Sequence, residues 1–389
     1  MLSHTPNGTL RFRGKHYRTG QLLDILSNQG KIIHVGPADS SHPHYQAEWI
    51  APPLFDWQIN GCLGHAFSSP TLNQKDVCAI AAEVVRHGVG SFCPTLITAS
   101  HETLHRSFSL LSQMVDFDPK FACQMPAFHL EGPYISPEDG PRGAHPRNHV
   151  RPPSLDEFHR LQDAASGRIR MVTLAPEHHG ALAFIEKLVA ENVVVAIGHT
   201  AATPQRIREA IHAGATVSTH LGNGCGAMIH RHENVIWEQL AADELTAGFI
   251  PDGHHLPPSL IRCLLRVKTP ARLVLTCDAS GLAGLPPGTY SLWDQSVQVR
   301  EDGALVIPGT PYLAGSGSFT DDCLRCLLSL GEVALADALE MASNQPRERL
   351  KLPPVGWEIG SSADLILFDH NEQTPFQVKY TILQGEERE

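Results

Sequence analysis

The 389-residue sequence predicts an α/β protein, a TIM-like (β/α)8 barrel joined to a small β-sandwich domain that both chain termini form. Three observations support this prediction. Eight apolar runs alternate with helix-like segments, several runs end in a histidine or an acidic residue, and both termini carry strand-like pieces between Gly and Asn turns. We therefore expect the barrel to comprise residues 53–358 and the small domain residues 1–52 and 359–389.

The eight apolar runs are the expected barrel strands. A strand in a parallel sheet is buried on both faces, so it consists of consecutive apolar residues. Alternation of such strands with helices implies a parallel sheet, and eight repeats are the number that closes a barrel. The runs lie near residues 53–57, 91–95, 126–131, 170–174, 193–198, 215–219, 246–250 and 272–277.

The connector between the fifth and sixth runs has room for only one short helix. Thr203 can act as its N-cap, Pro204 can occupy its first position, and Gly214 can end it. Apolar residues at positions 207, 210 and 211 then share one face of the helix. This unit would bring the ends of the two flanking strands to the same rim of the barrel.

The two chain termini differ from the rest of the sequence. Short strand-like pieces separated by turn residues occur at both ends, and the economical interpretation is a single β domain. The pieces are Thr9–Arg13, Leu22–Leu26 and Lys31–Val35 at one end, and Ala363–Phe368 and Phe376–Leu383 at the other.

Composition excludes several classes of protein. A formal net charge of −11 argues against a nucleic-acid or anionic-membrane partner, because such proteins usually carry a basic surface. Residues 1–8 contain no basic region followed by an apolar run, and no segment approaches the length of a membrane span, so we expect a cytoplasmic protein. The nine cysteines lie in apolar contexts typical of reduced thiols, and the Cys323–Cys326 pair is expected to pack within a helix.

Three of the apolar runs end in side chains that can bind a metal, namely Glu131, His199 and His220. Residues just past the C-terminal ends of barrel strands face the active site, so these three could meet. One carboxylate and two imidazoles, with a fourth position left for water, are typical of a catalytic zinc site. A fourth run ends in Asp278, which could act as the general base.

Seven motifs in this chain resemble, in order, those of the N-acetylglucosamine-6-phosphate deacetylases of the amidohydrolase superfamily. The resemblance covers nearly the whole chain and implies a metal-dependent hydrolase barrel with a β-sandwich built from both termini. The motifs are Asp56–Gly61 (DWQING), His129–Pro133 (HLEGP), Gly198–Thr200 (GHT), Thr219–Asn223 (THLGN), Asp252–His255 (DGHH), Thr276–Ala279 (TCDA) and Leu313–Ser316 (LAGS).

The resemblance also implies roles for individual residues. Glu131, His199 and His220 would hold one divalent metal. Asp278 would take a proton from the metal-bound water and later give it to the departing amine, and His145 would contact the acetyl carbonyl oxygen. Zn2+ suits these ligands best, although Fe2+, Co2+ or Mn2+ can occupy such sites.

Many relatives in the superfamily bind a second metal through a His-x-His motif at the end of the first strand. Here those positions are Gln58 and Asn60, and neutral amides are poor zinc ligands, so we expect a single metal. The end of the fourth strand, Thr173–Glu177, also lacks the lysine that related binuclear enzymes carbamylate. This absence argues against dihydroorotase-like or hydantoinase-like chemistry.

By the same resemblance, His255, Asn223 and Gly224 would contact the sugar phosphate, and three residues would border the pocket: Leu313, Ala314 and Gly315. The family also grips the phosphate with an arginine from a neighbouring subunit, which implies a homodimer. Arg231 occupies that position if the alignment starts from His220 without a gap, and His232 does if it is anchored on Glu233.

The sequence therefore predicts an enzyme that hydrolyses N-acetylglucosamine 6-phosphate to glucosamine 6-phosphate and acetate. Three alternatives remain open. The substrate could be another N-acetylhexosamine, such as N-acetylgalactosamine 6-phosphate or an unphosphorylated sugar; the enzyme could deacylate N-acyl amino acids; or the barrel could be catalytically silent and serve in binding. Loss of a metal ligand or of the general base would favour the last, and none of the four residues is missing.

Overall fold

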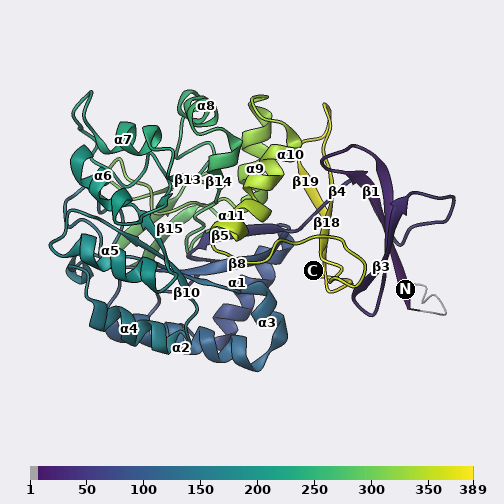
Figure 1. Ribbon diagram of the computed structural model, residues 1–389, viewed down its shortest axis with the longest axis horizontal. Helices are drawn as coiled ribbons and strands as arrows, with labels where there is room; N and C mark the ends of the chain where they lie inside the picture. Colours follow the sequence, from purple (N-terminus) through teal and green to yellow (C-terminus); the bar gives the residue numbers. More distant parts are fainter. Residues whose placement is uncertain (1–7, 294, 389) are drawn as a thin grey trace.

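The computed structural model describes residues 8–293 and 295–388, which form a barrel with a small β domain at one side (Figure 1). Residues 1–7, which belong to the segment said above to contain no basic region followed by an apolar run, lie outside this described part of the chain. None of the helices in residues 8–293 and 295–388 combines the length and apolar character needed to cross a membrane.

The barrel is an eight-stranded parallel sheet in the order β14-β13-β12-β11-β10-β9-β8-β5. Every predicted run overlaps one of these strands, so the prediction of a (β/α)8 fold is confirmed. Their bounds are β5 Leu54–Ile59, β8 Val89–Ile97, β9 Phe128–Glu131, β10 Ile169–Leu174, β11 Val194–Ile197, β12 Val217–Ser218, β13 Thr246–Phe249 and β14 Leu273–Leu275.

The first and last strands meet at one rim, where Ile59, the last residue of β5, forms a parallel bridge with Ala279, four residues beyond β14. The fully buried carboxylate of Asp56 joins the same two strands. It accepts hydrogen bonds from the Cys277 amide (2.8 Å) and from the Thr276 hydroxyl. Burial raises the pKa of Asp56 above its ordinary value, although these donors oppose the shift. A single buried acid therefore links β5 to β14 near the candidate site.

Helices surround the barrel (Figure 1). The α6 helix confirms the predicted connector, because Thr203 accepts a hydrogen bond from the Arg206 amide and Pro204 is the first helical residue. Gly214 follows the helix with φ of 111°, a conformation that favours glycine. The helices are α1 Gln74–Arg86, α2 His101–Phe117, α3 Pro119–Gln124, α4 Leu155–Ala164, α5 Ala181–Ala190, α6 Pro204–His212, α7 Val235–Ala241, α8 Pro258–Val267, α9 Thr320–Ser329, α10 Leu335–Met341 and α11 Asn344–Arg349, with 3-10 turns η1 Arg147–His149 and η2 Pro270–Arg272.

Both ends of the chain contribute to one seven-stranded sheet, in the order β20-β19-β18-β4-β1-β2-β3. The far strand β3 returns to the segment before β18, where the Ile32 amide donates to the Ser361 carbonyl (2.9 Å). The faces of the expected sandwich are therefore parts of one curled sheet around an apolar core. Its strands are β1 Thr9–His16, β2 Leu22–Asn28, β3 Lys31–Pro37, β4 Tyr45–Ala51, β18 Leu365–Asp369, β19 Gln377–Leu383 and β20 Glu386–Glu387; β4 was not among the predicted pieces.

Two further sheets were not predicted from the sequence. The strands β6 (Gly61–Cys62) and β7 (His65–Ala66) form a short hairpin after β5. A three-stranded antiparallel sheet follows β14 and consists of β15 Gly288–Leu292, β16 Gln295–Val299 and β17 Leu305–Val306. Gln295 of this sheet donates to the Ala144 carbonyl (2.8 Å), so the sheet lies against the loop that carries His145.

Candidate active site

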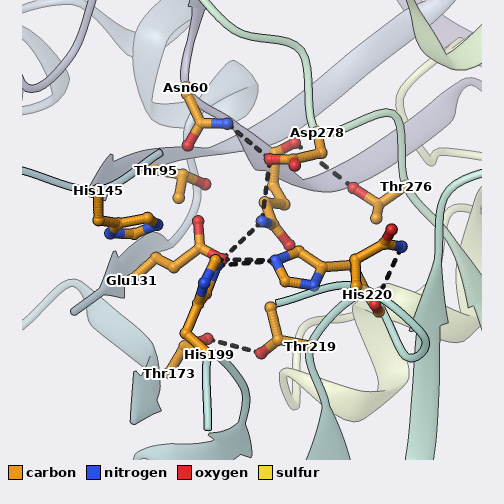
Figure 2. A network of polar contacts seen from close by, with 12 residues as sticks. Asn60, Thr95, Glu131, His145, Thr173, His199, Thr219, His220, Thr276 and Asp278 are labelled. Carbon is orange, nitrogen blue, oxygen red and sulfur yellow. Dashed lines mark hydrogen bonds and ion pairs between the residues drawn. The ribbon is translucent and has the colours of Figure 1, made fainter. Parts of the chain in front are cut away.

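The structure brings the three candidate metal ligands together. Glu131 is the last residue of β9, and His199 and His220 lie two residues beyond β11 and β12. Figure 2 shows their side chains converging on one point. The Glu131 Oε1 atom lies 3.1 Å from His220 Nε2 and 3.4 Å from His199 Nε2, and the two imidazole nitrogens are 3.1 Å apart. All three residues are buried.

The chemistry of these atoms fits a bound cation. His199 Nδ1 lies 2.9 Å from the Pro141 carbonyl, which can only accept, so this nitrogen carries the proton and Nε2 presents a lone pair. Burial opposes ionisation of Glu131, but contacts with His199 and His220 outweigh it and hold its pKa well below the ordinary value. A lone pair and a carboxylate therefore face each other, and a divalent ion would satisfy both.

A second group of possible ligands comprises His87, Asp321 and Asp322. Its carboxylates already have partners: Asp322 pairs with Arg325 (2.6 Å), and Asp321 lies 2.8 Å from His87 Nδ1. This group is explained as a junction between α1 and α9. The site of Glu131, His199 and His220 is the one that lies in the barrel mouth.

Asp278 lies above the candidate ligands, three residues beyond β14, and is buried (Figure 2). Burial and then the negative charge of Glu131 raise its pKa to about 6. A carboxyl group with such a pKa can both accept and donate a proton near neutral pH. Asp278, His199 and His220 all have a positive φ, of 53°, 50° and 29° respectively. Such backbone conformations are uncommon outside glycine and are concentrated at functional sites.

Gln58 and Asn60 act here as hydrogen-bond donors. The Gln58 amide nitrogen donates to Glu131 Oε1 (2.9 Å) and to Asp278 Oδ1 (3.0 Å). The Asn60 amide nitrogen donates to the same Asp278 oxygen at 2.7 Å. The two amides therefore orient both carboxylates, and they occupy the space in which relatives were expected to hold a second metal.

His145 lies beside the same site. Its ring centroid is 4.3 Å from that of His199, and its Nδ1 atom is 2.9 Å from the Thr98 hydroxyl. Burial and then the neighbouring His199 hold the pKa of His145 well below the ordinary value, so the ring is neutral. When Thr98 donates to Nδ1, the proton resides on Nε2, which is then a donor. The loop that carries His145 thus places a neutral histidine at the candidate metal site.

A cavity of about 690 Å3 opens above these residues. Most of the predicted substrate contacts line it: Asn223, Gly224, His255, Leu313 and Gly315. Ala314 does not, because its methyl group is buried in the apolar core of the β15–β17 sheet. Arg231 and His232 are exposed and do not line the cavity of their own chain.

Sequence reasoning missed Asp252, which contacts the cavity residue His255, and it missed two residues of the cavity wall itself. Asp252 accepts a hydrogen bond from His255 Nδ1 (2.7 Å), and Ser316 donates to the same Asp252 oxygen (2.8 Å). Contacts with His255 outweigh burial and hold the pKa of Asp252 well below the ordinary value. Asp252 falls within a quoted motif and was therefore identifiable. Trp293 and Arg300 of the β15–β17 sheet also line the cavity, and no motif marks them.

The fold and the site together define a class, an eight-stranded βα barrel with two histidines and a carboxylate gathered at the C-terminal ends of its strands. The Amidohydrolase family model matches residues 41–388. The chain belongs to the amidohydrolase family and is a hydrolase.

Individual relatives are more specific. N-acetylglucosamine-6-phosphate deacetylase of Homo sapiens is 35% identical over 350 residues, covering 87% of this chain and 82% of the relative. N-acetylgalactosamine-6-phosphate deacetylase of Escherichia coli O157:H7 is 33% identical over 343 residues, covering 87% and 89%. Among solved structures, a mutant N-acetyl-D-glucosamine-6-phosphate deacetylase of Mycobacterium smegmatis in complex with N-acetyl-D-glucosamine-6-phosphate has a TM-score of 0.87 and 30% identity, covering 98% of this chain and 99% of that one. The resemblance drawn from the motifs is confirmed.

Proposed function

We propose that the protein is a metal-dependent deacetylase that hydrolyses N-acetylglucosamine 6-phosphate to glucosamine 6-phosphate and acetate. The observation that carries this proposal is the placement of Glu131, His199 and His220 within hydrogen-bonding distance of one another, in one cavity with Asp278. The choice of substrate rests on the names of the relatives given above, since this chain covers more than four fifths of their length.

The residues account for the two proton transfers that amide hydrolysis requires. A divalent ion held by Glu131, His199 and His220 would polarise the acetyl carbonyl and lower the pKa of water to about 7. Asp278 accepts the proton of the attacking water and then delivers it to the nitrogen as the C–N bond breaks. The oxygen of the attacking water ends in acetate, and the proton that Asp278 carries ends on the free amine.

Two other groups support this chemistry. Gln58 and Asn60 fix the orientation of Asp278 through their donated hydrogen bonds. His145 is neutral, and its Nε2–H can donate to the acetyl oxygen as negative charge develops there. Burial of all these groups in the barrel strengthens their electrostatic effects relative to bulk water.

We further propose one metal per subunit, with Zn2+ favoured and Fe2+, Co2+ or Mn2+ also compatible with the ligands. The amide groups of Gln58 and Asn60 support a single ion, because their N–H donors face the carboxylates and N–H groups do not bind cations. A second metal would have to displace these hydrogen bonds.

The sugar phosphate would bind in the cavity above the metal site, against Asn223, Gly224 and His255. Asp252 orients the imidazole of His255 through Nδ1 and leaves Nε2 for the ligand. N-acetylgalactosamine 6-phosphate is the second candidate substrate, because one relative of similar identity is named for that sugar.

A homodimer is proposed for the same site. The exposed segment that carries Arg231 also displays Met228 and Trp237, whose side chains are 95% and 50% exposed. The Trp237 indole donates to the Arg231 carbonyl (3.1 Å), so the apolar and basic groups are adjacent. Such a patch fits a subunit contact in which Arg231 or His232 reaches the phosphate in the partner's cavity. We also propose that the protein is located in the cytoplasm.

The test is acetate release by the purified, metal-analysed protein from three compounds side by side: N-acetylglucosamine 6-phosphate, N-acetylgalactosamine 6-phosphate and N-acetylglucosamine. We expect the highest kcat/KM with the first. A higher value with the galactosamine derivative supports the second candidate substrate. Activity with the unphosphorylated sugar alone contradicts the proposed phosphate site, and no acetate from any of them contradicts the proposed function.

A further inference from the structure

A second cavity, of about 280 Å3, lies at the opposite end of the barrel from the candidate active site. Its wall combines Ser91 at the N-terminal end of β8, the helix α3, the segment after α11 and the β domain. Strand β19 of the β domain packs against β8 and α1 in the same region. The cavity therefore lies at the junction of the barrel and the β domain.

The charge of this cavity differs from that of the protein. Lys120, Arg347 and Arg388 line it, and among the described residues Asp364 is the one acid on its wall. Arg388 is itself paired with Glu386 (3.1 Å), which leaves Lys120 and Arg347 as the cations available to a ligand. Asp364 is already engaged by the Ser362 hydroxyl (2.9 Å) and the Gln384 amide (2.6 Å). A basic cavity in a chain of net charge −11 is suited to an anion.

Arg347 is the central cation of this cavity. It donates to the Ser91 hydroxyl (2.7 Å) and to the Pro353 carbonyl (2.8 Å), and its guanidinium lies 5.3 Å from the centre of the Phe55 ring. In the part of the chain that the structure describes, no carboxylate pairs with it. Burial lowers the pKa of Arg347, an effect that Asp364 only partly opposes. A half-buried arginine that has unused N–H groups and forms no ion pair with a carboxylate is a potential anion ligand.

Two other polar atoms on residues of this wall are buried without a hydrogen-bond partner in residues 8–293 and 295–388. They are the Nε atom of Arg388, which is a donor, and the Oε1 atom of Gln124, which is an acceptor. Gln124 is 2% exposed. Buried polar groups are normally paired, so a ligand that supplies both an anionic oxygen and a hydroxyl would complete the wall.

We propose that this cavity binds a small hydroxylated anion, a phosphate ester or a hydroxycarboxylate, through Arg347 and Lys120. The ligand would join the barrel to the β domain and would stabilise the folded protein in proportion to its occupancy. The inference does not depend on the proposed deacetylase activity, because the cavity shares no residue with the metal site.

The test uses the metal-loaded full-length protein and three probes: glycerol 3-phosphate, malate and, as a neutral comparison, glycerol. Binding is measured by calorimetry and by the midpoint of thermal unfolding. The variants are Arg347→Gln and Lys120→Gln, with Lys187→Gln as the matched control, since Lys187 is an exposed lysine on α5. Lys120 is also exposed, so its variant is expected to fold even if Arg347→Gln does not.

We expect at least one anion to bind the parent protein, and Arg347→Gln and Lys120→Gln to weaken it about tenfold or more while Lys187→Gln does not. The two anionic probes distinguish a phosphate from a carboxylate ligand. Cys123 gives a local readout because its exposed thiol lines the cavity, whereas the exposed Cys78 and Cys263 do not. A bound anion should slow alkylation of Cys123 alone. No binding of either anion, equal affinity in all variants, or equal binding of glycerol would overturn the proposal.

Discussion

Replacing Asp278 by Asn removes the proposed proton acceptor while keeping the size of the side chain. The amide oxygen of the new residue can still accept the hydrogen bonds that Gln58 and Asn60 now donate to Asp278. The substitution also removes a carboxylate whose pKa of about 6 reflects burial and repulsion from Glu131. The folded state should therefore be as stable as the parent protein, or more stable.

The expected loss of activity follows from the role of a general base. Removal of such a group typically costs about 10²- to 10⁴-fold in rate, and we expect kcat to fall within that range. Acetate release from N-acetylglucosamine 6-phosphate measures kcat, metal analysis checks that the ion is still bound, and thermal unfolding checks the fold. Turnover within about tenfold of the parent, in a metal-loaded and folded Asp278→Asn protein, would refute the assigned role.

The pH dependence of the parent enzyme bears on the same residue. A base must be ionised, so activity should fall as the solution becomes more acidic than the pKa of Asp278. That pKa is about 6 without a bound cation, and a nearby cation lowers it, so the acidic limb of kcat/KM should lie at or below about pH 6. An acidic limb above pH 7 would contradict the assignment of Asp278 as the base.

Three further predictions concern the metal, the phosphate and the β domain. Glu131→Ala should lose both bound metal and acetate release, and full metal content in the folded variant would contradict the ligand assignment. Arg231→Gln should raise KM for the phosphorylated sugar about tenfold or more and leave the unphosphorylated sugar unaffected; His232→Gln is the paired variant, and an unchanged KM in both would remove this segment from phosphate binding. Asp24→Asn should lower the midpoint of thermal unfolding at pH 7, because the buried Asp24 carboxylate bonds to two arginines of β1.

The sign of the last effect depends on pH. Burial raises the pKa of Asp24, but the bonds from Arg13 and Arg11 outweigh it, so the folded-state pKa lies below the ordinary 3.8. The stabilisation is therefore present above pH 3.8 and is lost as the pH falls through the lower, folded-state value. The difference in midpoint between Asp24→Asn and the parent should shrink on that acidification. An equal difference at neutral and strongly acidic pH would contradict this explanation.

The barrel and its central residues were predictable because they depend on local sequence. A run such as Val193–Ile197 indicates a buried parallel strand, and the chain direction of the barrel then brings His199, two residues further on, to the rim shared with His220. The position of Glu131 at the end of β9 follows by the same rule. Periodicity and motif order were thus sufficient for the part of the site that strand ends create.

The remaining features depend on contacts between distant segments, which local patterns do not specify. Gln58 was interpreted as a lost metal ligand, whereas its role as a donor to Asp278 depends on a contact across 220 positions. Arg300 and Trp293 reach the cavity through the pairing of β15, β16 and β17, which no motif marks. The same reason explains why the basic cavity around Arg347 could not be predicted, since its wall combines the barrel and the C-terminal strands.

Titration of the metal-free protein with Zn2+, with acetate release from N-acetylglucosamine 6-phosphate measured at each step, tests the central claim most directly. We expect no activity without metal, and a linear rise that reaches its plateau at one ion per chain. Undiminished turnover by the metal-free protein, or a plateau only at two ions per chain, would contradict a single ion held by Glu131, His199 and His220.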